Sequence, residues 1–226
     1  MKKLLTLALC AFLFACGGGG GGGGFALPVA TTPDKTAEPA PQAQKACTVE
    51  LYGDSIMAGN GTAETPAMVL RALRPELAVI DKAVAGTSLQ QLAARFYNDP
   101  RSARVIVIEN GVIDSWAHMT AAEFKSVLGG MVDYVRAEGR VPVITGFSHQ
   151  VAGLVLAPGA LQGREQLNAA AAELAEAKGV HFADWGSVQF DGPADVPDSV
   201  HPGRAYSDRL IERLAVTLDA AAGCRP

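Results

Sequence analysis

From Cys47 onward, short runs rich in β-branched residues alternate with longer amphipathic runs, and few folds accommodate this alternation. The expected strands are TVELYG (48–53), LAVIDKA (77–83), RVIVIEN (104–110), VPVITGF (141–147) and GVHFAD (179–184). Helical periodicity covers 65–74, 88–97, 120–138, 160–178 and 203–221. Apolar residues fill both faces of the third and fourth strands, which is typical of a sheet covered on both sides. The pattern predicts a three-layer α/β domain, a doubly wound sheet of five mainly parallel strands with helices on both faces.

One domain accounts for this pattern. The chain has 226 residues, and the domain is expected to occupy residues 46–226, a length that one hydrophobic core can serve. The formal net charge is -4, and the expected domain contains no cluster of lysine and arginine. Because phosphate backbones attract basic surfaces, nucleic acid is not an expected partner.

The N-terminal residues are typical of an export signal. A positively charged start precedes an apolar run (4–14) that is too short to span a bilayer comfortably, and Ala15 is the small residue that a cleavage site requires. The segment LFAC (13–16) is similar to a bacterial lipoprotein cleavage box. It predicts a signal peptide at 1–15 and a diacylglyceryl group on Cys16. An ordinary secreted protein cleaved nearby is the alternative.

Residues 16–45 are expected to form a flexible tether. A run of glycines (17–24) is followed by FALPVATTPDKTAEPAPQAQK, which is rich in Pro, Ala, Thr and Gln. Neither part can bury enough apolar surface to offset the entropy lost on ordering. The protein is therefore expected to be exported and lipid-anchored in the bacterial cell envelope, with its domain close to a membrane.

Beyond Cys16 only two cysteines remain, Cys47 and Cys224, one at each end of the expected domain. In an oxidising compartment they are expected to form a disulfide, since chain termini commonly lie close together. Two unrelated buried thiols are the alternative. The cysteines and histidines show no spacing typical of metal ligands, so no metal and no organic cofactor is expected.

Ligands of doubly wound sheets bind beyond the carboxyl ends of the strands, so the loops that follow the strands are expected to carry the chemistry. Asp54 and Ser55 follow the first strand, and Gly86 follows the second. The segment NGVID (110–114) follows the third strand, and His201 lies in the long loop after the fifth.

Ser55 can act as a nucleophile only if a base activates it and a third group orients that base. Among the four histidines, His201 is distinguished by Asp198, three residues before it. In a tight turn this spacing returns the carboxylate to Nδ1 of the imidazole and leaves Nε2 to accept a proton. Such a pair alone is weak evidence for catalysis, because capping also explains it; its combination with a serine after the first strand is informative.

The other histidines are expected to be solvated, capping or core residues (His118, His149 and His181), and Asp191 and Asp195 are further candidate partners for His201.

Four segments carry a resemblance to a known family. They are YGDSIMAG (52–59), DKAVAGTSLQQL (81–92), VIVIENGVIDSW (105–116) and DSVHPG (198–203). Their order and approximate spacing are similar to the signature blocks of the GDSL or SGNH hydrolases, and the match spans essentially the whole domain. The resemblance implies a flavodoxin-like sheet, with Ser55 as nucleophile, His201 as general base and then acid, and Asp198 as orienting carboxylate. It also implies that the backbone N–H groups of Ser55 and Gly86 bind the oxyanion.

The third segment departs from the family pattern. Ile113 stands where the family has an asparagine whose side chain is the third oxyanion donor, and isoleucine cannot donate a hydrogen bond. Asn110 is the candidate replacement, although the pair NG is equally typical of a turn. Losing one such donor costs about 3 to 4 kcal/mol of transition-state stabilisation. Without a replacement, slow turnover is expected.

An ordinary α/β-hydrolase is disfavoured. Its nucleophile elbow is Gly-x-Ser-x-Gly, whereas Met57 occupies the place of the second glycine here. Asp54, before the serine, is expected to hold the turn.

These observations favour a serine esterase that cleaves carboxylic esters through an acyl-enzyme. Its ester substrate is an acylated glycan, a lipid or a small ester, and the sequence does not distinguish among them. One alternative is a carbohydrate- or cell-wall-binding module that keeps the scaffold without turnover. Another is acyl transfer to a sugar hydroxyl, which uses the same residues.

Overall fold

A computed structural model of the protein describes residues 47–153 and 156–223. Four predictions fall on residues outside these ranges and stay predictions: the signal peptide at 1–15, the tether at 16–45, the lipidation of Cys16, and the pairing of Cys47 with Cys224.

Five strands form one sheet: β1 (Thr48–Tyr52), β2 (Ala78–Asp81), β3 (Val105–Ile108), β4 (Val141–Thr145) and β5 (His181–Ala183). The strand order is β2-β1-β3-β4-β5, and every neighbouring pair is parallel. Each strand lies within its predicted range. The order is that of flavodoxin-like sheets, so the predicted doubly wound fold is confirmed. The direction of winding reverses between β1 and β3, and ligands of such sheets bind at this switch point.

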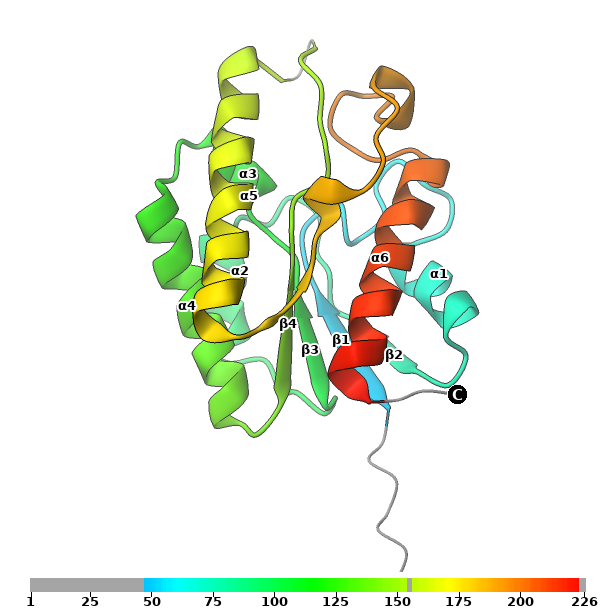
Figure 1. Cartoon of the computed structure of the whole chain (residues 1–226), viewed down its shortest axis with the longest axis vertical. Helices are drawn as coiled ribbons and strands as arrows, with labels where there is room; N and C mark the ends of the chain where they lie inside the picture. Colours follow the sequence, from blue (N-terminus) through cyan, green and yellow to red (C-terminus); the bar gives the residue numbers. More distant parts are fainter. Residues whose placement is uncertain (1–46, 154–155, 224–226) are drawn as a thin grey trace, which may run out of the picture. The chain divides into compact units, whose positions relative to one another are not determined.

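The helices are α1 (Pro66–Leu73), α2 (Leu89–Phe96), α3 (Val112–Trp116), α4 (Ala121–Ala137), α5 (Pro158–Lys178) and α6 (Arg204–Ala222), with the 3-10 turns η1 (Trp185–Ser187) and η2 (Pro193–Asp195). Helices α1 and α6 pack together on one face of the sheet, and α2, α4 and α5 form a layer on the other face (Figure 1). The three layers agree with the prediction. Helix α3 and the two 3-10 turns were not predicted.

The core lies on both faces of the sheet. All four residues of β3 are buried, which explains the uninterrupted apolar run in this strand. On one face, α6 packs against β4 and β5 and buries Leu210, Leu214 and Leu218, which recur every four residues along the helix. Burying a leucine side chain contributes about 1.5 to 3 kcal/mol, so this stripe fixes α6 and the loop that precedes it.

Local signals set where two of the helices begin. Helix α2 starts at a capping box in which Ser88 and Gln91 satisfy each other's backbone N–H groups, and Thr120 with Glu123 does the same for α4. The start of α2 follows Gly86 closely. The capping box therefore also fixes one end of the loop between β2 and α2.

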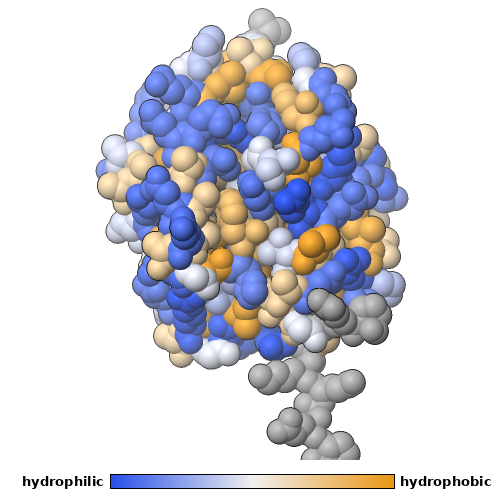
Figure 2. All heavy atoms as spheres, viewed as in Figure 1, coloured by the Kyte–Doolittle hydropathy of each residue, from blue (hydrophilic) through white to orange (hydrophobic). Residues whose placement is uncertain are grey.

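On the face shown in Figure 2, hydrophobic residues form small groups among hydrophilic ones. The large hydrophobic side chains that are exposed come from several elements: Met68, Ile80, Val84, Tyr97 and Val216. Single exposures of this kind are normal for globular proteins. Over residues 47–153 and 156–223, no helix has both the length and the apolar character that crossing a bilayer requires.

Candidate active site

Ser55 lies in a tight turn directly after β1, at the carboxyl edge of the sheet. The turn winds like a helix, because the N–H of Ala58 donates to the carbonyl of Asp54 at 3.0 Å and the N–H of Asn60 donates to the carbonyl of Ser55 at 2.9 Å. The carboxylate of Asp54 accepts the N–H of Ile56 at 2.8 Å. Asp54 therefore braces the turn that presents the Ser55 hydroxyl.

Gly53 begins this turn because no side chain fits there. A Cβ atom on Gly53 would lie 2.4 Å from Cβ of Met57 and 2.5 Å from Oε2 of Glu109. Met57 is fully buried, so the position that an α/β-hydrolase elbow gives to a second glycine is a core position here. The turn that carries Ser55 therefore differs from the nucleophile elbow of the α/β-hydrolases.

Asp198 and His201 lie in a second tight turn, shortly before α6. Oδ1 of Asp198 accepts the N–H of Val200 at 2.9 Å and the N–H of His201 at 2.7 Å. Oδ2 of Asp198 contacts Nδ1 of His201 at 2.6 Å. Ser199 between them has a φ of 75°, in the left-handed region, and the chain can therefore fold back on itself. One short segment supplies both the imidazole and the carboxylate that orients it.

The two turns meet across the carboxyl edge. Nε2 of His201 lies 2.9 Å from Oγ of Ser55, although 146 residues separate them. When Asp198 accepts a proton donated by Nδ1, Nε2 is the acceptor and the serine hydroxyl donates to it. The side chains of His201 and Asp198 are 22% and 53% exposed. The cluster is therefore accessible from solvent.

Asp198 is held in its ionised form. Burial raises the pKa of Asp198, but hydrogen bonds from the His201 ring and from the N–H groups of His201 and Val200 outweigh burial. The resulting pKa lies below the ordinary aspartate value. At neutral pH the carboxylate therefore carries the negative charge that favours a proton on Nδ1 of His201.

Gly86 lies beside the Ser55 turn. The N–H of Val84 donates to the carbonyl of Gly53 at 3.0 Å, which joins the segment after β2 to the turn after β1. Gly86 has a φ of 76°, and no atom lies within 4 Å of the position that its Cβ would take. Among the hydrogen bonds between described residues, none uses the N–H of Gly86 or of Ser55. Both amides can therefore donate to a ligand.

Asn110 supports the loop that carries Gly86. It is 6% exposed, and its Nδ2 donates to the carbonyl of Thr87 at 3.0 Å. Its Oδ1 is buried and has no hydrogen-bond partner among the described residues. One hydrogen of Nδ2 is not used by the bond to Thr87. Ile113 lies within α3 and offers only a hydrocarbon side chain.

Asp114 holds the same loop from its other end. Oδ2 of Asp114 accepts the N–H of Leu89, in the first turn of α2, at 2.7 Å. Burial raises the pKa of Asp114, and N–H groups that include those of Leu89 and Gln90 partly oppose this. This contact was not predicted from the sequence, because it joins residues that are 25 positions apart. The available signal was the aspartate that ends the family's third block.

Two buried acids lie under Ser55. Asp54 is 1% exposed and Glu109 is 3% exposed, and Oε2 of Glu109 accepts the N–H of Asp54 at 3.0 Å. Burial raises the pKa of Asp54 to about 7 and raises the pKa of Glu109 well above its ordinary value. From the sequence, Glu109 was expected at the end of a strand, without a functional role.

The remaining candidates do not join the cluster. His149 contacts the carbonyl of Gly186 at 2.9 Å and stacks on Phe190, and burial lowers its pKa. Asp195 contacts Arg209 at 2.6 Å instead of His201. His118, with a φ of 59°, and His181, on β5, are exposed.

In the part of the chain that the structure describes, no group of three His, Cys, Asp or Glu side chains is arranged to hold a metal ion.

Comparison with known proteins adds independent observations. The model of the GDSL-like lipase/acylhydrolase family matches residues 51–209. The fold is similar to that of the lipase/acylhydrolase from Enterococcus faecalis, with 18% identity, a TM-score of 0.67, and coverage of 76% of this chain and 95% of that one. It is similar to a carbohydrate acetylesterase family member from Sinorhizobium meliloti, with 20% identity, a TM-score of 0.66, and coverage of 78% and 99%.

A third similar structure is a GDSL-like lipase from Bacteroides thetaiotaomicron, with 18% identity, a TM-score of 0.65, and coverage of 77% of this chain and 89% of that one. At these identities the likeness shows the fold. A comparison with curated proteins finds no match.

Proposed function

The chain belongs to the GDSL-like lipase/acylhydrolase family, and we propose that it is a serine esterase that hydrolyses carboxylic esters. Ser55 is the nucleophile, His201 the general base and Asp198 the carboxylate that orients the base. The observation that carries the proposal is the distance of 2.9 Å between Oγ of Ser55 and Nε2 of His201. A serine hydroxyl is a poor nucleophile until a base within hydrogen-bond reach removes its proton.

Acylation follows from this geometry. Oγ of Ser55 attacks the ester carbonyl carbon while Nε2 of His201 takes the hydroxyl proton. The imidazolium that forms is stabilised by Asp198, which is 2.6 Å from Nδ1. His201 then returns the proton to the departing alcohol oxygen, and the acyl group remains on Ser55. Water activated by the same imidazole attacks the acyl-enzyme and releases the carboxylic acid.

The oxyanion of each tetrahedral intermediate needs hydrogen-bond donors. We assign this role to the N–H groups of Ser55 and Gly86, because Gly86 is exposed and neither N–H donates to another described residue. Asn110 is the candidate third donor. Its Nδ2 keeps one hydrogen beyond the bond to Thr87.

Export and a lipid anchor on Cys16 belong to the same proposal. The apolar start, the LFAC segment and the composition of residues 16–45 support them. An anchored domain of this kind would act on esters in the bacterial cell envelope. Acylated carbohydrates are one class to test, since one structural relative is a carbohydrate acetylesterase family member.

The test is ester hydrolysis by the full chain, purified in detergent, with aryl esters of increasing acyl length and an acetylated oligosaccharide. Ser55→Ala should abolish turnover and covalent labelling by a fluorophosphonate. Ser187→Ala is the matched control, because the Ser187 hydroxyl is bonded within its own turn at 3.0 Å, and this variant should keep both properties.

Three outcomes separate the alternatives. Turnover that depends on Ser55 supports the esterase. No turnover with any ester, together with no labelling of Ser55, would favour a carbohydrate- or cell-wall-binding module. Ester formation on an added sugar acceptor, at the expense of free acid, would identify acyl transfer.

A further inference from the structure

The carboxyl group of Glu109 reaches under the turn that presents the nucleophile. Glu109 follows β3, and its backbone N–H donates to the carbonyl of Tyr52 at 2.9 Å, which places it beside the end of β1. From there its Oε2 accepts the N–H of Asp54 at 3.0 Å. The same oxygen fills the space next to Gly53, where a Cβ atom would lie only 2.5 Å away. Glu109 and this turn are therefore packed as one unit.

Hydrogen bonds to carboxyl groups hold the backbone on both sides of Ser55. The N–H of Asp54 donates to Oε2 of Glu109 at 3.0 Å, and the N–H of Ile56 donates to Oδ1 of Asp54 at 2.8 Å. Ser55 lies between these two bonds in the sequence. The backbone angles that set the direction of the Ser55 side chain are thus fixed by the carboxyl group of Glu109, just after β3, and by that of Asp54 in the turn itself.

We propose that Glu109 is a positioning residue for the nucleophile, which fixes the backbone of Asp54 and so keeps Oγ of Ser55 opposite Nε2 of His201. The inference rests on the proposed function, because it assigns a role within the same reaction. It also states what the role requires, namely a hydrogen-bond acceptor at the end of the residue 109 side chain, without a negative charge.

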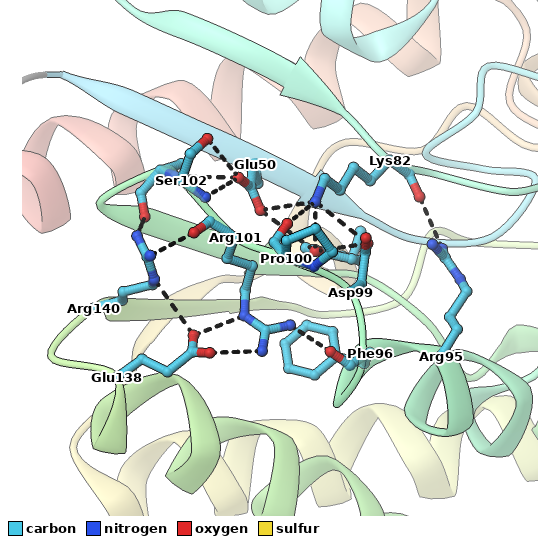
Figure 3. A network of polar contacts seen from close by, with 12 residues as sticks. Glu50, Lys82, Arg95, Phe96, Asp99, Pro100, Arg101, Ser102, Glu138 and Arg140 are labelled. Atoms are coloured by element: carbon cyan, nitrogen blue, oxygen red, sulfur yellow. Dashed lines mark hydrogen bonds and ion pairs between the residues drawn. The ribbon is translucent and has the colours of Figure 1, made fainter.

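The chain contains a natural comparison for Glu109. Glu50, on β1, is also buried, at 1% exposure, and also accepts backbone N–H groups, from Ser102 at 2.7 Å and Ala103 at 3.1 Å. Unlike Glu109, it is paired with a cation, Lys82, at 3.5 Å (Figure 3). Its bonds hold the loop that leads into β3, at the amino edge of the sheet. Glu50 therefore also fixes a loop by accepting backbone N–H groups, but it does so far from the nucleophile.

Glu109 has no such cation. None of the ion pairs among the described residues includes Glu109 or Asp54. The titratable groups that act on this pair are each other, His201 from the turn before α6, and Asp114 from α3. Two neighbouring carboxyl groups without an ion-pair partner are not both ionised in a dry interior. The carbonyl oxygen of a protonated Glu109 still accepts the N–H of Asp54, and a glutamine offers the same oxygen.

The experiment compares Glu109→Met with Glu109→Gln in the full chain. Methionine keeps the volume and removes the acceptor, so kcat should fall about a hundredfold while KM stays within about threefold. Glutamine keeps the acceptor, so kcat should stay within about threefold of wild type. The rate of fluorophosphonate labelling of Ser55 should follow kcat.

Glu50→Gln is the matched control. It should lower the thermal midpoint, because it weakens the bond to Lys82, and it should leave kcat and the labelling rate unchanged. A general loss of packing would move midpoint and kcat together in all three variants. A positioning role predicts that kcat falls only when residue 109 loses its hydrogen-bond acceptor, and that Glu109→Gln keeps kcat near the wild-type value.

Several results would overturn the inference. Wild-type kcat in a folded Glu109→Met variant would do so, as would a Glu109→Gln variant as slow as the methionine variant. If the methionine variant does not fold, Glu109→Asp takes its place, because the shorter side chain withdraws the acceptor; wild-type kcat in that variant is then the contrary result. Absence of Ser55-dependent turnover in the wild-type chain would instead overturn the proposed function, and the inference with it.

Discussion

Replacing Asp198 by asparagine isolates the hydrogen bond that orients the imidazole. In the wild type, Oδ1 of Asp198 accepts two backbone N–H groups, at 2.7 and 2.9 Å, while Oδ2 faces Nδ1 of His201 at 2.6 Å. Asparagine has one carbonyl oxygen, and the two N–H groups hold it in the place of Oδ1. The NH2 group then faces Nδ1, so the ring proton moves to Nε2 and Ser55 loses its acceptor. We expect kcat to fall about ten-thousand-fold at neutral pH.

The assay is hydrolysis of a saturating aryl ester, with thermal unfolding to show that the turn before α6 is intact. Asp195→Asn is the control, because this buried carboxylate of the same loop contacts Arg209 at 2.6 Å and does not contact His201. It should reduce stability and change kcat less than about tenfold. If Asp198→Asn also remained within about tenfold of wild type, the imidazole would have to be oriented by another group, and the assignment of Asp198 would be wrong.

Three further perturbations follow from the structure. Burial raises the pKa of Glu50, but backbone N–H groups and Lys82 outweigh it and hold the pKa below its ordinary value. The stabilising contribution of Glu50 is therefore present above its unfolded-state pKa and is lost as the pH falls through its folded-state pKa. As the pH is lowered below about 4, the thermal midpoint should decrease more steeply in the wild type than in Glu50→Gln. Gly53→Ala should destabilise the domain by about 1 to 3 kcal/mol in denaturant unfolding, because the added methyl meets Oε2 of Glu109 at 2.5 Å. Asn110→Ala removes both the bond to Thr87 and the candidate oxyanion donor, so kcat should fall about a hundredfold; unchanged kcat would show that neither contribution is needed.

The sheet was predictable because each strand and helix carries its own pattern. The five strands lie within the predicted apolar runs, and the strands of a doubly wound sheet are mostly parallel, as all four neighbouring pairs are here. The pairing of Asp198 with His201 was predictable for the same reason, since a single turn holds both. Helix α3 was missed because it has five residues and begins just after the pair NG, which favours a turn.

Contacts between distant segments were not predictable in this way. Glu109 lies 55 residues from Asp54, and an acid at the end of an apolar strand is equally compatible with a solvated strand end. Its burial follows from the absence of a side chain at Gly53, which opens the space that the carboxyl group fills. A glycine before Asp54 was visible in the sequence, but the atom that uses its space was not.

The loss of the family asparagine at Ile113 is best understood through the loop between β2 and α2. Nδ2 of Asn110 donates to the carbonyl of Thr87 at 3.0 Å, and Asp114 accepts the N–H of Leu89 at 2.7 Å. The third family segment (105–116) therefore holds the residues that follow Gly86. An oxyanion donor is effective to the extent that it is already in place when charge develops. If the Gly86 amide binds the oxyanion as proposed, this segment supports it by fixing the Gly86 loop, and that support does not depend on the residue at position 113.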